Sequence, residues 1–151
     1  MAGPQQQISV QDLDFRQLSE VKKQLDDELE HLTTSFAQLK QAQAKFKSCI
    51  ADVEEVNPKN QDKPILIPLT SSLYVPGKLT DTENVIVDVG TGYYVSKTRK
   101  EALTHYTSKT QFVKKNLDTL QGTIEKKQEN VQMVMQLMMQ RQQQQQQQEA
   151  A

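Results

Sequence analysis

The chain has 151 residues, of which 36% are hydrophobic and 5% are aromatic, and it contains no Trp. This composition leaves too little apolar material for a large globular core. The 18 basic and 19 acidic residues give a formal net charge of −1, so the sequence lacks the electrostatic signature of nucleic-acid or anionic-lipid binding. We therefore expect protein partners, and neither a nucleic acid nor a membrane.

Cysteine content and hydropathy indicate the cellular compartment of the protein. A single cysteine, Cys49, cannot form an intrachain disulfide, and no apolar run approaches the roughly 18 residues of a membrane span. The polar segment 1–7 does not resemble a secretory signal. These features predict a cytoplasmic protein that could also enter the nucleus.

The first part of the chain predicts one long helix over residues 14–57. Either Ser9 or Asp14 could cap its free amides, with Asp14 favoured, and no Gly or Pro follows until Pro58. A seven-residue apolar repeat keeps one seam of a helix facing a partner, as in a coiled coil. The seam positions are Leu18, Leu25, Leu32, Leu39, Phe46 and Val53. Residues 1–8 are expected to be disordered.

Residues 64–95 change to a composition rich in β-branched and aromatic side chains, which predicts two β-hairpins. Turn chemistry is expected at Pro76-Gly77 and at Gly90-Thr91-Gly92, and Pro68 requires an edge or the end of a strand. Because an isolated two-stranded hairpin is marginal in water, we expect other chains to complete a larger sheet. The four strand segments are Ile65–Ile67, Leu73–Val75, Val85–Val87 and Tyr93–Val95.

A second helix is predicted over residues 98–141. It starts at the capping box formed by Thr98 and Glu101. Its length is close to that of the first helix, which an antiparallel hairpin requires. The glutamine-rich segment 142–151 is expected to be a disordered tail. The two seam lines of this helix are Leu103, Thr110, Leu117, Ile124, Val131 and Met138, and Tyr106, Val113, Leu120, Lys127 and Val134.

No group of residues predicts catalysis, a cofactor or a metal. Gly90-Thr91-Gly92 follows a predicted strand but lacks the remaining positions of a dinucleotide fingerprint or a P-loop. His31 and His105 have no Cys or second His at ligand spacing. Cys49 fits a small buried side chain of the first seam, and the acidic cluster 26–30 lacks the glycine of an EF-hand. We therefore do not expect an enzyme.

The segment from Val131 to Met139 carries more apolar side chains than one seam can bury. Flexible methionines suit surfaces that accept many apolar shapes, and antiparallel pairing places them opposite the apolar start of the first helix. The alternative is that these methionines only thicken the last layer of the coiled coil. The predicted binding residues at this tip are Phe15, Leu18, Val21, Leu25, Val131, Met133, Val134, Met135, Met138 and Met139.

The insert segments Ile67–Lys78 (IPLTSSLYVPGK) and Asp88–Val95 (DVGTGYYV), with flanking helices of this order and length, resemble the α-class subunits of prefoldin. The resemblance spans residues 8–140 and excludes the glutamine tail. It implies a heterohexamer of two α-class and four β-class subunits, with a double β-barrel body and helical hairpins as tentacles. In that family the tentacle ends hold unfolded proteins, notably actin and tubulin, and deliver them to the cytosolic group II chaperonin without ATP.

Carried onto this sequence, the resemblance makes the helix ends a client surface and the strands an assembly surface. The predicted assembly residues are Ile65, Ile67, Leu69, Leu73, Val75, Val85, Val87, Val89 and Tyr94. The alternative function is a structural coiled-coil scaffold or a transcriptional adaptor, and an enzyme is a third. The two hairpins favour the chaperone, because a scaffold has little use for them.

Overall fold

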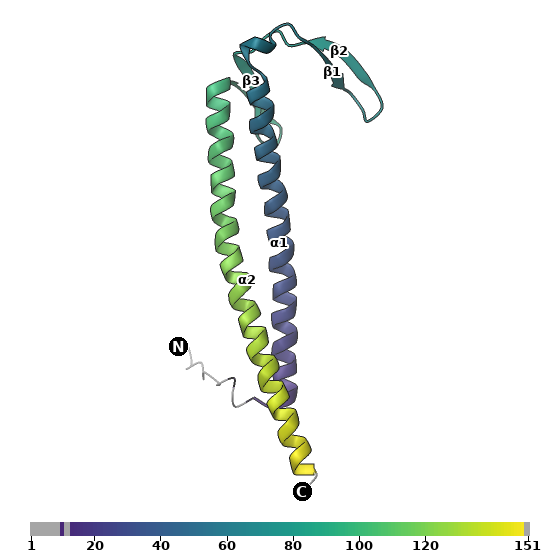
Figure 1. The fold of residues 1–151 in the computed structure, drawn as a ribbon, viewed down its shortest axis with the longest axis vertical. Coiled ribbons are helices and arrows are strands. Elements are labelled where there is room, and N and C mark those ends of the chain that lie inside the picture. The colour runs from purple at the N-terminus through teal and green to yellow at the C-terminus, as the bar shows by residue number, and fades with distance from the viewer. Residues whose placement is uncertain (1–9, 11–12, 150–151) are drawn as a thin grey trace. The chain divides into compact units, whose positions relative to one another are not determined.

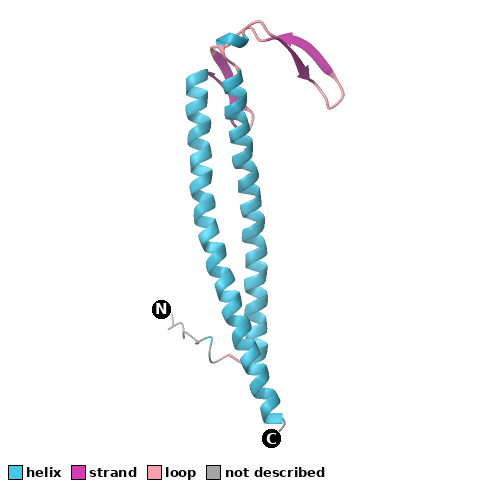
Figure 2. Cartoon of the chain, viewed as in Figure 1, coloured by secondary structure: helices cyan, strands magenta, loops and turns pink. Residues whose placement is uncertain are grey.

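The computed structural model describes residue 10 and residues 13–149 of the chain. Residues 1–8, for which the sequence predicts disorder, lie outside the described residues. Figure 1 labels the helices and strands, and Figure 2 draws helices in cyan and strands in magenta. The order of elements is α1 (Phe15–Glu55), the 3-10 turn η2 (Pro58–Asn60), β1 (Pro64–Pro68), β2 (Tyr74–Lys78), β3 (Asn84–Gly90), β4 (Tyr93–Thr98) and α2 (Arg99–Glu149). The predicted arrangement of helix, two β-hairpins and helix is confirmed.

Helix α1 begins where Asp14 caps it. The Asp14 carboxylate accepts a hydrogen bond from the Gln17 amide at 2.7 Å, and the Gln17 side chain accepts one from the Asp14 amide at 3.0 Å. The helix ends at Glu55, two residues before the expected end at 57. The side-chain amide of Asn60 donates to the Glu55 carbonyl at 2.6 Å, so a side chain rather than a further helical turn satisfies the last carbonyl.

The chain divides into two compact units, to which both helices contribute. The terminal unit comprises Met1–Gln38 and Leu117–Ala151, and the hairpin unit comprises Leu39–Asn116. Within the terminal unit Lys127 forms an ion pair with Glu28. Within the hairpin unit the rings of Phe46 and Tyr106 lie 6.4 Å apart. Phe15 and Met139 line one cleft in the terminal unit, and Val53 packs against Ala102 in the hairpin unit. In each unit the α1 and α2 segments therefore run in antiparallel directions.

The predicted seams are confirmed, because every seam position of both helices is buried or half-buried. The fully buried members are Leu18, Val53, Val113, Leu117 and Val134. Cys49 is half-buried rather than buried. A pair of helices covers each seam side chain from one side only, which explains why many of them keep some exposure.

The four strands form two separate antiparallel pairs, β1 with β2 and β3 with β4 (Figure 1). The turn predicted at Gly90-Thr91-Gly92 joins β3 to β4, and all three residues have positive φ (135°, 43° and 82°). Glycine adopts such angles without steric cost, which explains its place on both sides of Thr91.

The turn predicted at Pro76-Gly77 is wrong. Both residues lie inside β2, where Pro76 faces Leu66 and Gly77 faces Ile65. The chain reverses instead between Leu69 and Leu73, where the Thr70 hydroxyl accepts a hydrogen bond from the Leu73 amide at 3.1 Å. A two-stranded sheet has free edges, so Pro76 does not need to donate to a neighbour. As expected for Pro68, β1 ends there.

The core of the hairpin unit joins both helices to one strand. It consists of Val53 from α1, Val87 from β3 and Ala102 from α2, with Val85, Leu103 and Tyr106 packed around them. Val87 is 1% exposed. Val87 was predicted as an assembly residue, and in this structure the chain's own helices already cover it. Strand β3 was expected to contact partner subunits. One of its faces instead packs against α1 and α2 of the same chain.

Helix α2 continues to Glu149, eight residues past the expected end at 141. The segment 142–149 is thus helical, and the expectation of a disordered tail over 142–151 is wrong for this part, while residues 150–151 are not described. Glutamine is a good helix former, and no Gly or Pro follows Gly122 to break the helix. The side chains of residues 142–148 are exposed.

Candidate functional site

The first candidate surface lies in the terminal unit, where the start of α1 meets the last third of α2. Four large apolar side chains are exposed there: Phe15 at 37%, Met133 at 57%, Met135 at 40% and Met139 at 55%. We call these four residues the tip surface. Soluble proteins rarely expose several such side chains together unless something binds them.

A cleft opens beside the tip surface. It has a volume of about 210 Å³. Its lining residues, which we call the tip cleft, are Phe15, Lys22, Met135, Met138, Met139 and Gln142. Three thioethers and one aromatic ring therefore face a common space. Methionine side chains adjust their three rotatable bonds to the shape of what they contact, so this cleft can accept apolar groups of different shapes.

The seam beneath the tip surface holds the two helices together. Leu18 is 1% exposed and Val134 is 4% exposed, so these two predicted binding residues lie in the seam and not on the exposed tip surface. Both occupy seam positions, where helix pairing takes their surface out of water. The remaining predicted tip residues, Val21, Leu25, Val131 and Met138, are half-buried. The methionines thus include one seam member, Met138, and three residues outside the seam.

Charged groups near the tip are paired. The Lys22 ammonium donates to the Asp26 carboxylate at 2.6 Å along α1. Lys127 donates to Glu28 across the two helices. This hydrogen bond, followed by the positive charge of Lys127, holds the pKa of Glu28 below its ordinary value of 4.5. The ion pair occupies the seam itself, since Lys127 stands at a predicted seam position.

A second apolar surface covers the hairpins. Of the predicted assembly residues, Val85 is half-buried and Val87 is buried. The others are exposed, namely Ile65, Ile67, Leu69, Leu73, Val75, Val89 and Tyr94. Five further residues lie in the predicted assembly strands but are not among those nine, and they are also exposed: Leu66, Tyr74, Ile86, Tyr93 and Val95. Together, these twelve exposed residues form what we call the hairpin surface.

The five further residues alternate with the predicted assembly residues along the strands. Successive side chains of a strand point to opposite faces, so Ile65 and Ile67 share one face of β1 and Leu66 lies on the other. Selecting alternate residues of β1 therefore found a single face of that strand. The signal that could have found the rest is the continuous apolar run Ile65-Leu66-Ile67, which is typical of strands buried on both faces. A sheet apolar on both faces needs cover from other chains.

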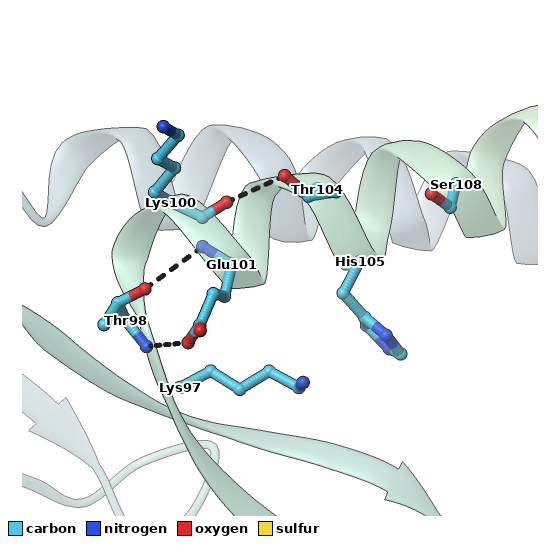
Figure 3. A pocket seen from close by; sticks show the side chains of 7 residues that line it. All are labelled: Lys97, Thr98, Lys100, Glu101, Thr104, His105 and Ser108. Atoms are coloured by element: carbon cyan, nitrogen blue, oxygen red, sulfur yellow. Dashed lines mark hydrogen bonds between the residues drawn. The ribbon is translucent and has the colours of Figure 1, made fainter.

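The start of α2 borders a wide polar cavity of about 680 Å³ (Figure 3). The predicted capping box is present: the Thr98 amide donates to Glu101 at 2.9 Å, and the Glu101 amide donates to the Thr98 hydroxyl at 3.3 Å. Hydrogen bonds from Thr98 hold the pKa of Glu101 below its ordinary value of 4.5. The capping box gives hydrogen-bond partners to the amides of Thr98 and Glu101 at the start of α2. These two residues therefore have a structural role.

His105 lines the same cavity. Burial, followed by the charges of Lys109 and Lys97, lowers the pKa of His105 from its ordinary value of 6.5. Figure 3 shows the Lys97 side chain, from the end of β4, and the His105 side chain, from α2, on the same side of the helix. Residues 10 and 13–149 contain no group of three or more His, Cys, Asp or Glu side chains that could hold a metal ion. Within that same part of the chain, no helix is long and apolar enough to cross a membrane.

Comparison with known proteins identifies the family of the chain. Residues 25–144 match the prefoldin subunit family. The chain belongs to the prefoldin family. It is 43% identical to a probable prefoldin subunit 5 of Schizosaccharomyces pombe over 91% of this chain and 90% of that protein. It is 44% identical to prefoldin subunit 5 of Homo sapiens over 87% of this chain and 86% of that protein. The resemblance seen in the sequence is confirmed.

The fold agrees with a solved prefoldin. A chain of the filamentous PFD from Methanocaldococcus jannaschii superposes with a TM-score of 0.69, covering 78% of this chain and 97% of that chain at 18% identity. This likeness shows the fold alone. Family membership makes the chain a subunit of a prefoldin chaperone rather than an enzyme, and it accounts for an unpaired hairpin surface by assembly with other prefoldin subunits.

Proposed function

We propose that this chain is one subunit of a heterohexameric chaperone that holds unfolded proteins at the tip surface without using ATP. The hexamer would contain two α-class and four β-class subunits and act in the cytoplasm, with access to the nucleus. Its clients would include actin and tubulin, and it would pass them to the cytosolic group II chaperonin. The observation that carries this proposal is the group of exposed Phe and Met side chains above a buried seam.

The chemistry of the tip surface suits a client without a fixed shape. Unfolded chains expose apolar side chains of many sizes, and burying each of them returns on the order of 1 kcal/mol or more. Such contacts are weak one at a time, and several tips acting on one client multiply their effect through high effective concentration.

The two hairpins support the oligomeric part of the proposal. Each pair of strands is isolated from the other, and a two-stranded sheet alone is marginal in water. Strands that leave backbone donors and acceptors unpaired at their edges can be extended by strands from another chain. We therefore infer that the hairpin surface completes a β-barrel together with the neighbouring subunits.

A substitution test separates client binding from folding. Met133, Met135 and Met139 are changed together to Gln, which has a similar length and favours helix, so the seam stays intact while apolar surface is lost. We expect several-fold weaker suppression of the aggregation of denatured actin by the assembled complex, measured by light scattering. This variant is a cleaner test than removing residues 131–151, because the deletion would also take Val134 out of the seam.

Phe112 offers a matched control. It is an exposed apolar residue of α2, at 64%, and belongs to the hairpin unit. Changing Phe112 to Gln should leave suppression at the level of the unchanged complex. Equal suppression by the triple variant and the unchanged complex would contradict the assignment of client binding to the tip surface.

A further inference from the structure

The distribution of methionine along the chain is uneven. The chain has five methionines; one is Met1 and the other four lie between residues 133 and 139. Three of these four, Met133, Met135 and Met139, are 57%, 40% and 55% exposed. The described part of the chain thus keeps all its thioethers on one stretch of α2, and most of them in contact with solvent.

Exposed thioethers are open to oxidation by peroxides. The sulfur attacks one oxygen of hydrogen peroxide, an S–O bond forms as the O–O bond breaks, and the second oxygen leaves as water after taking up a proton. The sulfur loses two electrons and the peroxide gains them. The product, methionine sulfoxide, is polar, and methionine sulfoxide reductases return it to methionine.

The position of these sulfur atoms decides what such a change would do. Met135 and Met139 line the tip cleft, so a sulfoxide there would replace an apolar surface with a strong dipole. The seam would survive, because its buried members here, Leu18 and Val134, contain no sulfur, and its one methionine, Met138, is half-buried. Oxidation would therefore alter the binding surface and leave the helix pair folded.

We propose that Met133, Met135 and Met139 are sites of reversible sulfoxidation, and that their oxidation by peroxide switches off client binding at the tip surface. The proposal rests on the proposed function of that surface. Met138 differs from the other three, since it is a half-buried seam residue, and it is oxidised more slowly.

The test uses the complete chain assembled with its partner subunits and a matched variant. All samples carry Cys49→Ser, which removes the single thiol of this chain from peroxide chemistry. The variant adds Met133→Leu, Met135→Leu and Met139→Leu, which keep the surface apolar but cannot be oxidised. Both complexes are treated with dilute hydrogen peroxide, and suppression of denatured-actin aggregation is measured before treatment, after it, and after repair by methionine sulfoxide reductases.

We expect the complex with native methionines to lose the larger part of its suppression on oxidation and to regain it on repair. The leucine variant should keep its suppression throughout. Mass spectrometry should place one added oxygen on each of Met133, Met135 and Met139, and circular dichroism should show unchanged helix content.

Equal loss in both complexes, or no oxygen on these residues, would overturn the proposal. Full suppression by the oxidised native complex would also overturn it, yet would leave the proposed function standing. Failure of the proposed function has a separate signature, namely no suppression by the untreated complexes.

Discussion

At the scale of single residues, an ion pair between Glu28 and Lys127 joins the two helices within the terminal unit. Lys127 stands at a seam position where the neighbouring positions, Leu120 and Val134, are apolar. A charged residue at one seam position favours the alignment that gives it a partner and disfavours shifted alignments. We infer that this pair fixes the register of the helices more than it adds to their stability.

The shifted pKa of Glu28 gives a pH-dependent prediction. Because the hydrogen bond from Lys127 holds the pKa of Glu28 below 4.5 in the folded chain, the folded state favours the carboxylate. The resulting stability is fully present above the unfolded value and is lost as the pH falls through the lower folded value. We expect Glu28→Gln to lower the Tm at pH 7 and to have no effect on it below the folded pKa.

Thermal unfolding followed by circular dichroism across acidic and neutral pH checks this expectation. The control is Glu30→Gln, which removes an exposed carboxylate from the same helix. A Tm difference between Glu28→Gln and the unchanged chain that stays constant down to the most acidic pH would rule out the ion pair as its source.

At the scale of elements, glycine has opposite roles in α2 and in the turn between β3 and β4. Gly122 is helical, and a Cβ added there meets nothing within 4 Å. Gly92 has a φ of +82°, a conformation that other residues adopt only with strain. The same substitution should therefore have opposite signs at the two positions.

We predict that Gly122→Ala raises the free energy of unfolding by about 0.5–1 kcal/mol, because alanine has less backbone freedom to lose in a helix. Gly92→Ala should lower it by about 1 kcal/mol or more through backbone strain. Denaturant unfolding of the two variants measures both values. A destabilised Gly122→Ala variant would show that the helix needs glycine there for packing against something outside the described contacts.

At the scale of the whole molecule, most of the exposed large apolar side chains belong to the tip surface or to the hairpin surface. We propose that each surface binds another protein. The hairpin surface contains Tyr94, 67% exposed, while the adjacent core contains Val87, 1% exposed. Substitutions at Tyr94 and at Val87 can therefore distinguish an effect on assembly from an effect on folding.

We predict that Tyr94→Asp blocks assembly with partner subunits but leaves the chain as stable as before, because a surface charge costs little in water. Val87→Asp should lower the free energy of unfolding by several kcal/mol, since it buries a carboxylate among Val53 and Ala102. Native mass spectrometry reports the assembly of each variant, and chemical unfolding reports its stability. Hexamers of normal mass formed by Tyr94→Asp would contradict the assembly role of the hairpin surface.

The sequence by itself determined the elements whose causes are local. Heptad spacing marked both seams, the oxygens of Asp14 and Thr98 marked both helix starts, and Gly90-Thr91-Gly92 marked a turn, because each signal depends on neighbours a few residues away. It also pointed to both apolar surfaces through their composition. The turn at Pro76-Gly77 was misjudged because proline and glycine also fit a strand with a free edge.

Only the tertiary structure decided which apolar residues face inward. Leu18 and Leu25 both occupy the predicted seam, yet only Leu18 is buried. Val87 and Val89 both belong to the alternating pattern of β3, yet Val87 is 1% exposed and Val89 is 46% exposed. The difference depends on which side chains are covered by another element of the chain. Such contacts join residues far apart in sequence, as Glu28 and Lys127 show, which are 99 positions apart. Composition can show that a segment is apolar, but water is excluded only where a second element packs over it.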